Sequence, residues 1–167
     1  NLGASRRSAA QHSQSLHVWL SHIPGLKVIL PSTPYDAKGL IKTAIRDDNP
    51  VVFFEDKMMF QDKGKVPEGD YTIPFGVADI KKEGTDITLI GTSSMVQVAL
   101  EAADHLAQIG ISAEVIDPRT ILPLDKKTLI DSFTSNDKSI VLLSGEDLFH
   151  LKEDEVFDLK EFLSPFF

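Results

Sequence analysis

The chain has 167 residues, of which 42% are hydrophobic and 25% are charged, as is usual for a globular protein. Its net charge of −8 and its lack of a lysine or arginine run argue against nucleic-acid binding. It has no cysteine, which excludes disulfides, thiol chemistry and thiolate-bound zinc and fits a reducing compartment.

Neither end of the chain suggests a membrane or secretory segment. The longest apolar runs are about five residues, far short of a membrane span, so no membrane association is expected. Residues 1–8 lack the apolar core of a signal peptide and do not begin with methionine. We therefore expect the sequence to be the middle of a longer chain.

A polar cluster, Gln-His-Ser-Gln-Ser at residues 11–15, precedes the first predicted helix. Apolar Leu16, Leu20 and Ile23 follow at helical spacing. The cluster is thus expected at or near a helix start, where backbone N–H groups lack partners and an anion or a catalytic imidazole, that of His12, can be held. The alternative, which residue types alone favour, is structural: serine and glutamine cap the helix and the histidine is partly exposed.

A strand–helix–strand unit comes next. Residues 26–30 form a short apolar strand, and Thr33 is a good N-cap for the helix that follows. That helix ends near residues 46–49, because Pro50 disfavours helix at the residue before it. Residues 51–54 form a second buried strand. Two strands joined by a helix predict a parallel sheet.

The rest of the chain divides into three parts. Residues 61–84 are rich in glycine and proline and are predicted to be a linker, with an extended piece at residues 71–73. A second series follows: strands at residues 86–90, 112–117 and 139–143, a long helix capped by Thr92-Ser93-Ser94, and a short helix at about 126–133. The predicted boundaries are 1–60 for the first domain, 61–84 for the linker, 85–147 for the second domain and 148–167 for a charged tail that is either an amphipathic helix or disordered.

Three stretches are candidate sites. The predicted helix end at Ala44, Ile45, Asp47 and Asn49 combines free carbonyl oxygens with side-chain oxygens, which suits a hard cation, although a plain Asp/Asn turn is commoner. Residues 91–94 join a strand to a helix and suit either a phosphate or, more simply, an N-cap. Glu55-Asp56 stands where a strand ends, a common place for sites in α/β proteins.

Separated motifs carry a resemblance to a known family. They are residues 9–56, which include AAQHSQSL, PSTPYDAKGL and AIRDDNP, then YTIP and GTD at residues 71–86, and EVIDPRT at 114–120. In this order and spacing, residues 9–144 resemble the beta subunit of thiamine-diphosphate-dependent 2-oxoacid dehydrogenases. The wording looks closest to the acetoin and pyruvate dehydrogenase branches and less like the branched-chain branch.

The resemblance implies an α/β fold: a parallel-sheet portion of a pyrimidine-binding domain followed by a partial transketolase C-terminal-like domain. It implies decarboxylation of a 2-oxoacid or cleavage of acetoin, with acyl transfer to a lipoyl group. Thiamine diphosphate and magnesium would be held mainly by an alpha subunit. The other implied partners are a second beta subunit and a lipoyl-bearing acyltransferase core. His12 matches the family's active-site histidine, and Ala44, Ile45, Asp47 and Asn49 match a structural potassium site.

This sequence also departs from the family pattern at three places. The glutamate that protonates the cofactor's aminopyrimidine would precede Asn1, Ser5-Arg6-Arg7-Ser8 replaces smaller residues before the histidine, and residues 148–167 do not resemble the family. We therefore expect the isolated chain to be inactive. The alternatives are a non-catalytic truncated paralogue that acts as a subunit-interaction module, or a tail produced by a frameshift. The expected location is the bacterial cytoplasm, with a mitochondrial or plastid matrix as the alternative.

Overall fold

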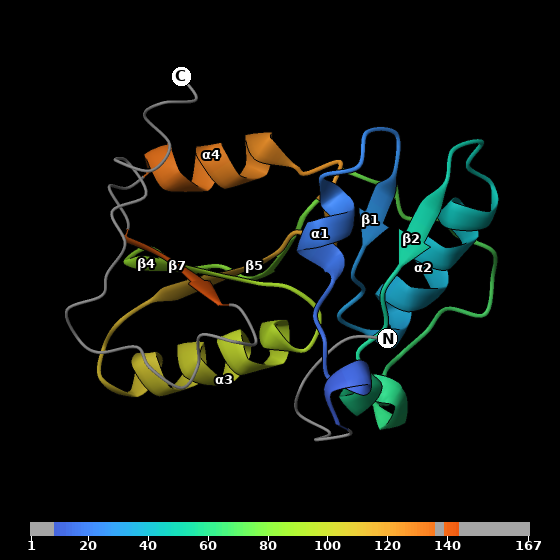
Figure 1. Ribbon diagram of the computed structural model, residues 1–167. Coiled ribbons are helices and arrows are strands. Elements are labelled where there is room, and N and C mark those ends of the chain that lie inside the picture. The colour runs from blue at the N-terminus through green and yellow to red at the C-terminus, as the bar shows by residue number, and fades with distance from the viewer. Residues whose placement is uncertain (1–8, 136–138, 144–167) are drawn as a thin grey trace.

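The computed structural model describes residues 9–135 and 139–143, which form two sheets with helices on their faces (Figure 1). The helices are α1 (His17–Ser21), α2 (Pro34–Ile45), α3 (Met95–Gln108) and α4 (Lys126–Ser135), with the 3₁₀ helices η1 (Ala10–His12) and η2 (Lys57–Gln61). The strands are β1 (Lys27–Ile29), β2 (Val51–Phe53), β3 (Asp79–Lys82), β4 (Ile87–Gly91), β5 (Ala113–Asp117), β6 (Thr120–Leu122) and β7 (Ser139–Leu143). The predicted tail at residues 148–167 lies outside the described residues.

The first sheet has the order β2-β1-β6, with β1 parallel to β2 and α2 between them in the chain, which confirms the predicted strand–helix–strand unit. Its central strand is apolar without alternation because both faces are covered. Val28 and Leu30 pack with Leu20 on the α1 side, whereas Ile29 packs with Leu40 of α2.

The second sheet has the order β3-β5-β4-β7, and β4 is parallel to both β5 and β7. Helices α3 and α4 lie on opposite faces of it (Figure 1). Leu89 and Val115 pack against alanines of α3, while Ile90 and Ile116 pack on the α4 side. The α/β class is therefore confirmed, with parallel strands at the centre of this sheet.

Two short strands were not predicted from the sequence, and each runs antiparallel to the strand with which it pairs. Strand β3 lies within the range 61–84 that the sequence predicts to be a linker, and it pairs with β5. Its sequence, Asp-Ile-Lys-Lys, is largely charged, as is common in edge strands, so it has no apolar run to detect. Strand β6 turns back from the second half of the chain and pairs with β1 of the first sheet.

The expected extended piece at residues 71–73 contains no strand. Instead, Ile73 is 5% exposed and belongs to the core beneath α2. It fits there because Gly39 has no side chain: a Cβ at that position would lie 2.6 Å from Ile73 Cγ1. The segment is therefore placed by tertiary packing. Among the described helices, none is both long and apolar enough to cross a membrane.

Candidate functional site

The polar cluster at residues 11–15 precedes α1 and does not cap it. Residues 10–12 form η1, and α1 begins only at His17. The N-cap residue of α1 is Leu16, which makes no side-chain cap bond, and neither does Ala9 before η1. The expectation that serine and glutamine side chains cap the first helix is therefore wrong, because a separate helical turn intervenes.

His12 ends η1 and is exposed. Its backbone carbonyl accepts a hydrogen bond of 2.7 Å from Lys57 Nζ, at the start of η2. Among the described residues, none hydrogen-bonds to the His12 imidazole, so the ring is open to a group bound from outside. This geometry suits a histidine that exchanges protons with a ligand held by another chain.

Asp56, noted above only as a residue at a strand end, is buried and has two partners. Its Oδ1 accepts from the Met58 backbone N–H at 2.8 Å, which caps η2. Its Oδ2 accepts from Ser94 Oγ at 2.6 Å. Ser94 occupies the N-cap position of α3, as the sequence predicts, but its side chain makes no cap bond to the helix.

The predicted cation site lies at the end of α2, whose last turn contains Ala44 and Ile45. The Asp47 carboxylate already has partners: Oδ2 pairs with Lys27 Nζ, and Oδ1 accepts from both the backbone N–H and the side-chain amide of Asn49, each at 2.9 Å. These bonds, that to Lys27 foremost, lower the pKa of Asp47 to about 2. The oxygens that remain for a cation are therefore the Asn49 side-chain oxygen and the carbonyls of the last turn, of which that of Ala44 already accepts from Asp47 N at 3.4 Å.

Two further observations bear on metal binding. No group of three or more histidine, aspartate or glutamate side chains that could hold a metal ion occurs among the residues that the structure describes. Carbonyl and amide oxygens, in contrast, are neutral donors suited to a singly charged hard cation. The four predicted residues are thus brought together by one helix end and the turn after it.

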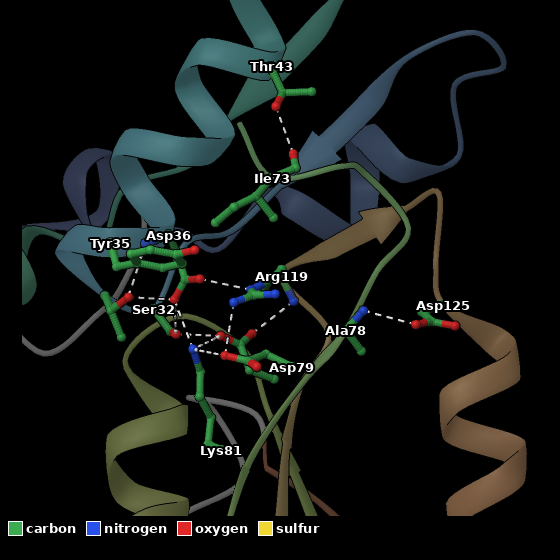
Figure 2. A network of polar contacts seen from close by, with 12 residues as sticks. Ser32, Tyr35, Asp36, Thr43, Ile73, Ala78, Asp79, Lys81, Arg119 and Asp125 are labelled. Atoms are coloured by element: carbon green, nitrogen blue, oxygen red, sulfur yellow. Dashed lines mark hydrogen bonds and ion pairs between the residues drawn. The ribbon is translucent and has the colours of Figure 1, made fainter. Parts of the chain in front are cut away.

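The largest polar feature of the structure is a buried charge cluster that the sequence did not predict, formed by Ser32, Asp36, Asp79, Lys81, Asp117 and Arg119 (Figure 2). Asp36 is fully buried at the start of α2, where its Oδ1 accepts from Arg119 Nε at 2.8 Å and its Oδ2 from Lys81 Nζ at 2.9 Å. Arg119 Nη2 and Lys81 Nζ also reach Asp79, at 2.9 Å and 2.7 Å. Asp36 thus joins the first sheet to β3 and to the turn after β5.

Asp117 is the second fully buried carboxylate of the cluster. Its Oδ1 accepts from the Arg119 backbone N–H at 2.8 Å, and Lys81 Nζ lies 3.5 Å from its Oδ2. Ser32 Oγ lies within hydrogen-bond distance of both the Asp117 and the Asp36 carboxylates. A hydroxyl has one proton to donate, so a proton on Asp117 allows both of these contacts to be hydrogen bonds.

The charges of the cluster do not balance, because three carboxylates face two cations. Burial by itself raises the pKa of Asp36, but the Thr33 hydroxyl, Lys81 and Arg119 outweigh it and lower the pKa. Burial raises the pKa of Asp117 more than Ser32 and Lys81 lower it. Burial lowers the pKa of Lys81, but its pairing with Asp79, Asp117 and Asp36 raises it overall. Asp117 is therefore the carboxyl group of the cluster that most readily keeps a proton, which offsets the surplus of negative charge.

The sequence contained only partial signals for this cluster. Thr33 was predicted as the N-cap of α2, and its Oγ1 does accept from the Asp36 N–H at 3.1 Å. An acidic residue in the first turn of a helix, such as Asp36, ordinarily interacts with the helix dipole, whereas the structure shows Asp36 to be an ion-pair partner of distant residues. Asp79 and Lys81 alternate with Ile80, the spacing of one strand face, but this strand was not recognised.

Comparison with known proteins identifies two consecutive domains. The family described as "Transketolase, pyrimidine binding domain" matches residues 1–63, and "Transketolase, C-terminal domain" matches residues 76–146. A solved structure titled "Split gene transketolase, inactive beta4 tetramer" has a similar fold, with a TM-score of 0.65 and 24% identity over 77% of this chain and 42% of that chain.

Three Bacillus subtilis proteins are similar in sequence. The beta subunit of acetoin:2,6-dichlorophenolindophenol oxidoreductase is 49% identical, covering 94% of this chain and 48% of that protein. The beta subunits of pyruvate dehydrogenase and 2-oxoisovalerate dehydrogenase are each 49% identical, covering 81% and 87% of this chain and 42% and 44% of theirs. The chain therefore spans about half the length of the relatives it matches. The branched-chain relative is as similar as the other two, contrary to the expectation that this branch is less like the chain.

Replacing Arg119 with methionine is expected to destabilise the fold. The variant keeps the bulk of the side chain but leaves Asp36 buried without its guanidinium partner, which costs about 3 kcal/mol or more of unfolding free energy. Urea denaturation measures the change as a lower midpoint at unchanged m-value. Lys127→Met is the control, since Lys127 is 85% exposed and its pair with Asp131 is solvated, and it should leave the midpoint unchanged. Equal midpoints for Arg119→Met and the native chain would contradict the assignment.

Replacing Asp117 with asparagine is expected to change how stability depends on pH. Because the folded-state pKa is raised, the native protein holds a proton that the unfolded chain releases, so Asp117 makes stability fall as pH rises from about 4 to the folded-state pKa. The variant should lack this decline and be more stable than the native chain at neutral pH. The Asp36 contribution has the opposite sign, is lost as pH falls below its unfolded-state pKa, and remains in both proteins. Thermal unfolding across this pH range measures the difference, and parallel curves would refute the prediction.

Proposed function

We propose that this chain, whose two domains match the transketolase pyrimidine-binding and C-terminal families and whose relatives are beta subunits of dehydrogenases, supplies the histidine side of an active site completed by an alpha subunit. The observation that supports this is the placement of His12. The residue is exposed on η1, and its described hydrogen bonds, to Ala9 and Lys57, use backbone atoms.

In the proposed reaction the substrate is acetoin, pyruvate or a branched-chain 2-oxoacid, and the acyl group passes to a lipoyl arm. His12 donates a proton to, and accepts one from, the reacting oxygen or the incoming lipoyl sulfur, as an imidazole can near neutral pH. Thiamine diphosphate, with magnesium, supplies the carbanion stabilisation when it is bound. The three relatives are equally similar, so identity does not choose among the substrates.

The proposed partners are an alpha subunit, a second beta subunit and a lipoyl-bearing acyltransferase core. Helix α1 supports a protein partner, since Val18 is 56% exposed and Trp19 is 66% exposed beside it. The same exposed face favours a second candidate function, a subunit-interaction module without chemistry. The proposed location is the cytoplasm of a bacterium, which the bacterial origin of the relatives supports.

The end of α2 is proposed to bind potassium. The neutral carbonyl oxygens of Ala44 and Ile45, with that of Asp47 and the Asn49 side chain, fit a monovalent cation better than a divalent one. The chain should then have a higher melting temperature in potassium chloride than in choline chloride at equal ionic strength, because a bound ion stabilises the folded state. Asn49→Ala should abolish the difference, whereas Asp48→Ala, an exposed neighbour outside the set, should keep it. An equal melting temperature in both salts for the native chain would refute the site.

To test the function, the native protein that contains this sequence is mixed with the alpha subunit of the Bacillus subtilis acetoin:2,6-dichlorophenolindophenol oxidoreductase. A defined heteromeric complex is expected by light scattering, with acetoin-dependent reduction of 2,6-dichlorophenolindophenol. His12→Ala should keep the complex but lower turnover by about 100-fold or more, because a proton-transfer group is lost. His105→Ala, on the exposed part of α3, is the control and should leave turnover unchanged.

The other outcomes separate the candidates. A complex that forms but never turns over substrate would favour the interaction module. Turnover by the isolated chain with added thiamine diphosphate would contradict the proposed role of the subunit interface. Full turnover by the His12→Ala complex would contradict the proposed role of His12.

A further inference from the structure

Three segments that are distant in the sequence meet around η2. Helix η1, with His12, and η2 lie side by side (Figure 1), joined by the bond from Lys57 Nζ to the His12 carbonyl. On its other side, η2 contacts the beginning of α3, where Ser93 Oγ lies 3.6 Å from Met59 Sδ. Helix η2 is therefore a bridge between the histidine segment and the second half of the chain.

The connection between η2 and α3 is made by the buried carboxylate of Asp56, which is 4% exposed. This carboxylate both caps η2 and accepts from the Ser94 hydroxyl at the start of α3. The positive end of the α3 dipole favours a negative charge at this place. Asp56 thus fixes the backbone from which the Lys57 side chain extends.

Helix η1, in contrast, has little to hold it. It contains no buried residue and no side-chain cap. Its two backbone bonds are long, at 3.3 Å from His12 N to Ala9 O and 3.4 Å from Ser13 N to Ala10 O. Within the described part of the chain, Lys57 is the side chain that hydrogen-bonds to η1. A charged donor on a backbone carbonyl is among the stronger hydrogen bonds available to such a turn.

We propose that Lys57 is a positioning residue for His12: its ammonium group clamps the carbonyl of the histidine to η2, which Asp56 anchors on α3. This positioning role of Lys57 depends on the function proposed above for His12. The clamp is a contact within this chain, so it can be tested without measuring enzyme activity. It makes the orientation of the histidine depend on the second domain through η2.

The test measures amide hydrogen exchange of residues 10–13 and of η2 by mass spectrometry in the native chain and in variants. Lys57→Met keeps the aliphatic stem but removes the donor, and it should speed exchange at residues 10–13 by roughly three- to tenfold while η2 stays protected. Lys57→Arg should restore protection. Ser94→Ala, which removes one Asp56 partner, should speed exchange in both η1 and η2. Lys63→Met, at an exposed lysine after η2, is the matched control and should change neither.

Unchanged exchange at residues 10–13 in Lys57→Met would overturn the clamp. In the assembled enzyme, Lys57→Met should lower kcat with little change in KM, and Lys57→Arg should restore it. Faster exchange with unchanged kcat would leave the clamp in place and overturn its positioning role. The proposed function is tested independently: it is contradicted if His12→Ala has no effect on turnover, regardless of the amide exchange rates measured in the Lys57 variants.

Discussion

The arrangement of the two sheets depends on the buried cluster around Asp36. A carboxylate with no solvent exposure is stable only with partners, and here those partners come from β3 and from the turn after β5. Arg119 is the key contributor. Its guanidinium pairs with Asp36, its N–H donates to Asp117, and its carbonyl accepts from Leu30 N at the end of β1. Its positive φ of 59° turns the chain so that β6 can join the first sheet.

This constraint explains why the boundary between the two halves is not a simple linker. Strand β6 belongs by sequence to the second half but extends the first sheet. Strand β3 lies before the second half's parallel strands, yet it supplies Asp79 and Lys81 to the cluster. Ion pairs are directional, so they fix the relative orientation of the sheets in a way that apolar contacts alone do not. Such specificity comes with a desolvation cost, which is visible in the raised pKa of Asp117.

The candidate site follows a different principle. His12 lies in a short turn without core residues, at a place where the described chain leaves its imidazole uncovered. The proposed cation site likewise uses the end of a helix. Both suit a subunit that works together with another chain, and the proteins to which this chain is similar are named as beta subunits. The buried part of the fold therefore supports both exposed elements: α2 ends at the proposed cation site, and η2 holds η1 with its His12.

Local sequence determined the elements with strong local signals: the apolar strands at β1, β2, β4, β5 and β7, and the helix α2 with its Thr33 cap and its end shortly before Asp47. Motif order determined the family. Tertiary structure alone decided where Ile73, β3 and β6 lie, because β3 is largely charged, β6 is a short piece between Pro118 and Pro123, and Ile73 belongs to no regular element. It also decided that Asp36, Asp117 and Arg119 meet. They are up to 83 residues apart in sequence, and only folding brings such charges into one buried volume.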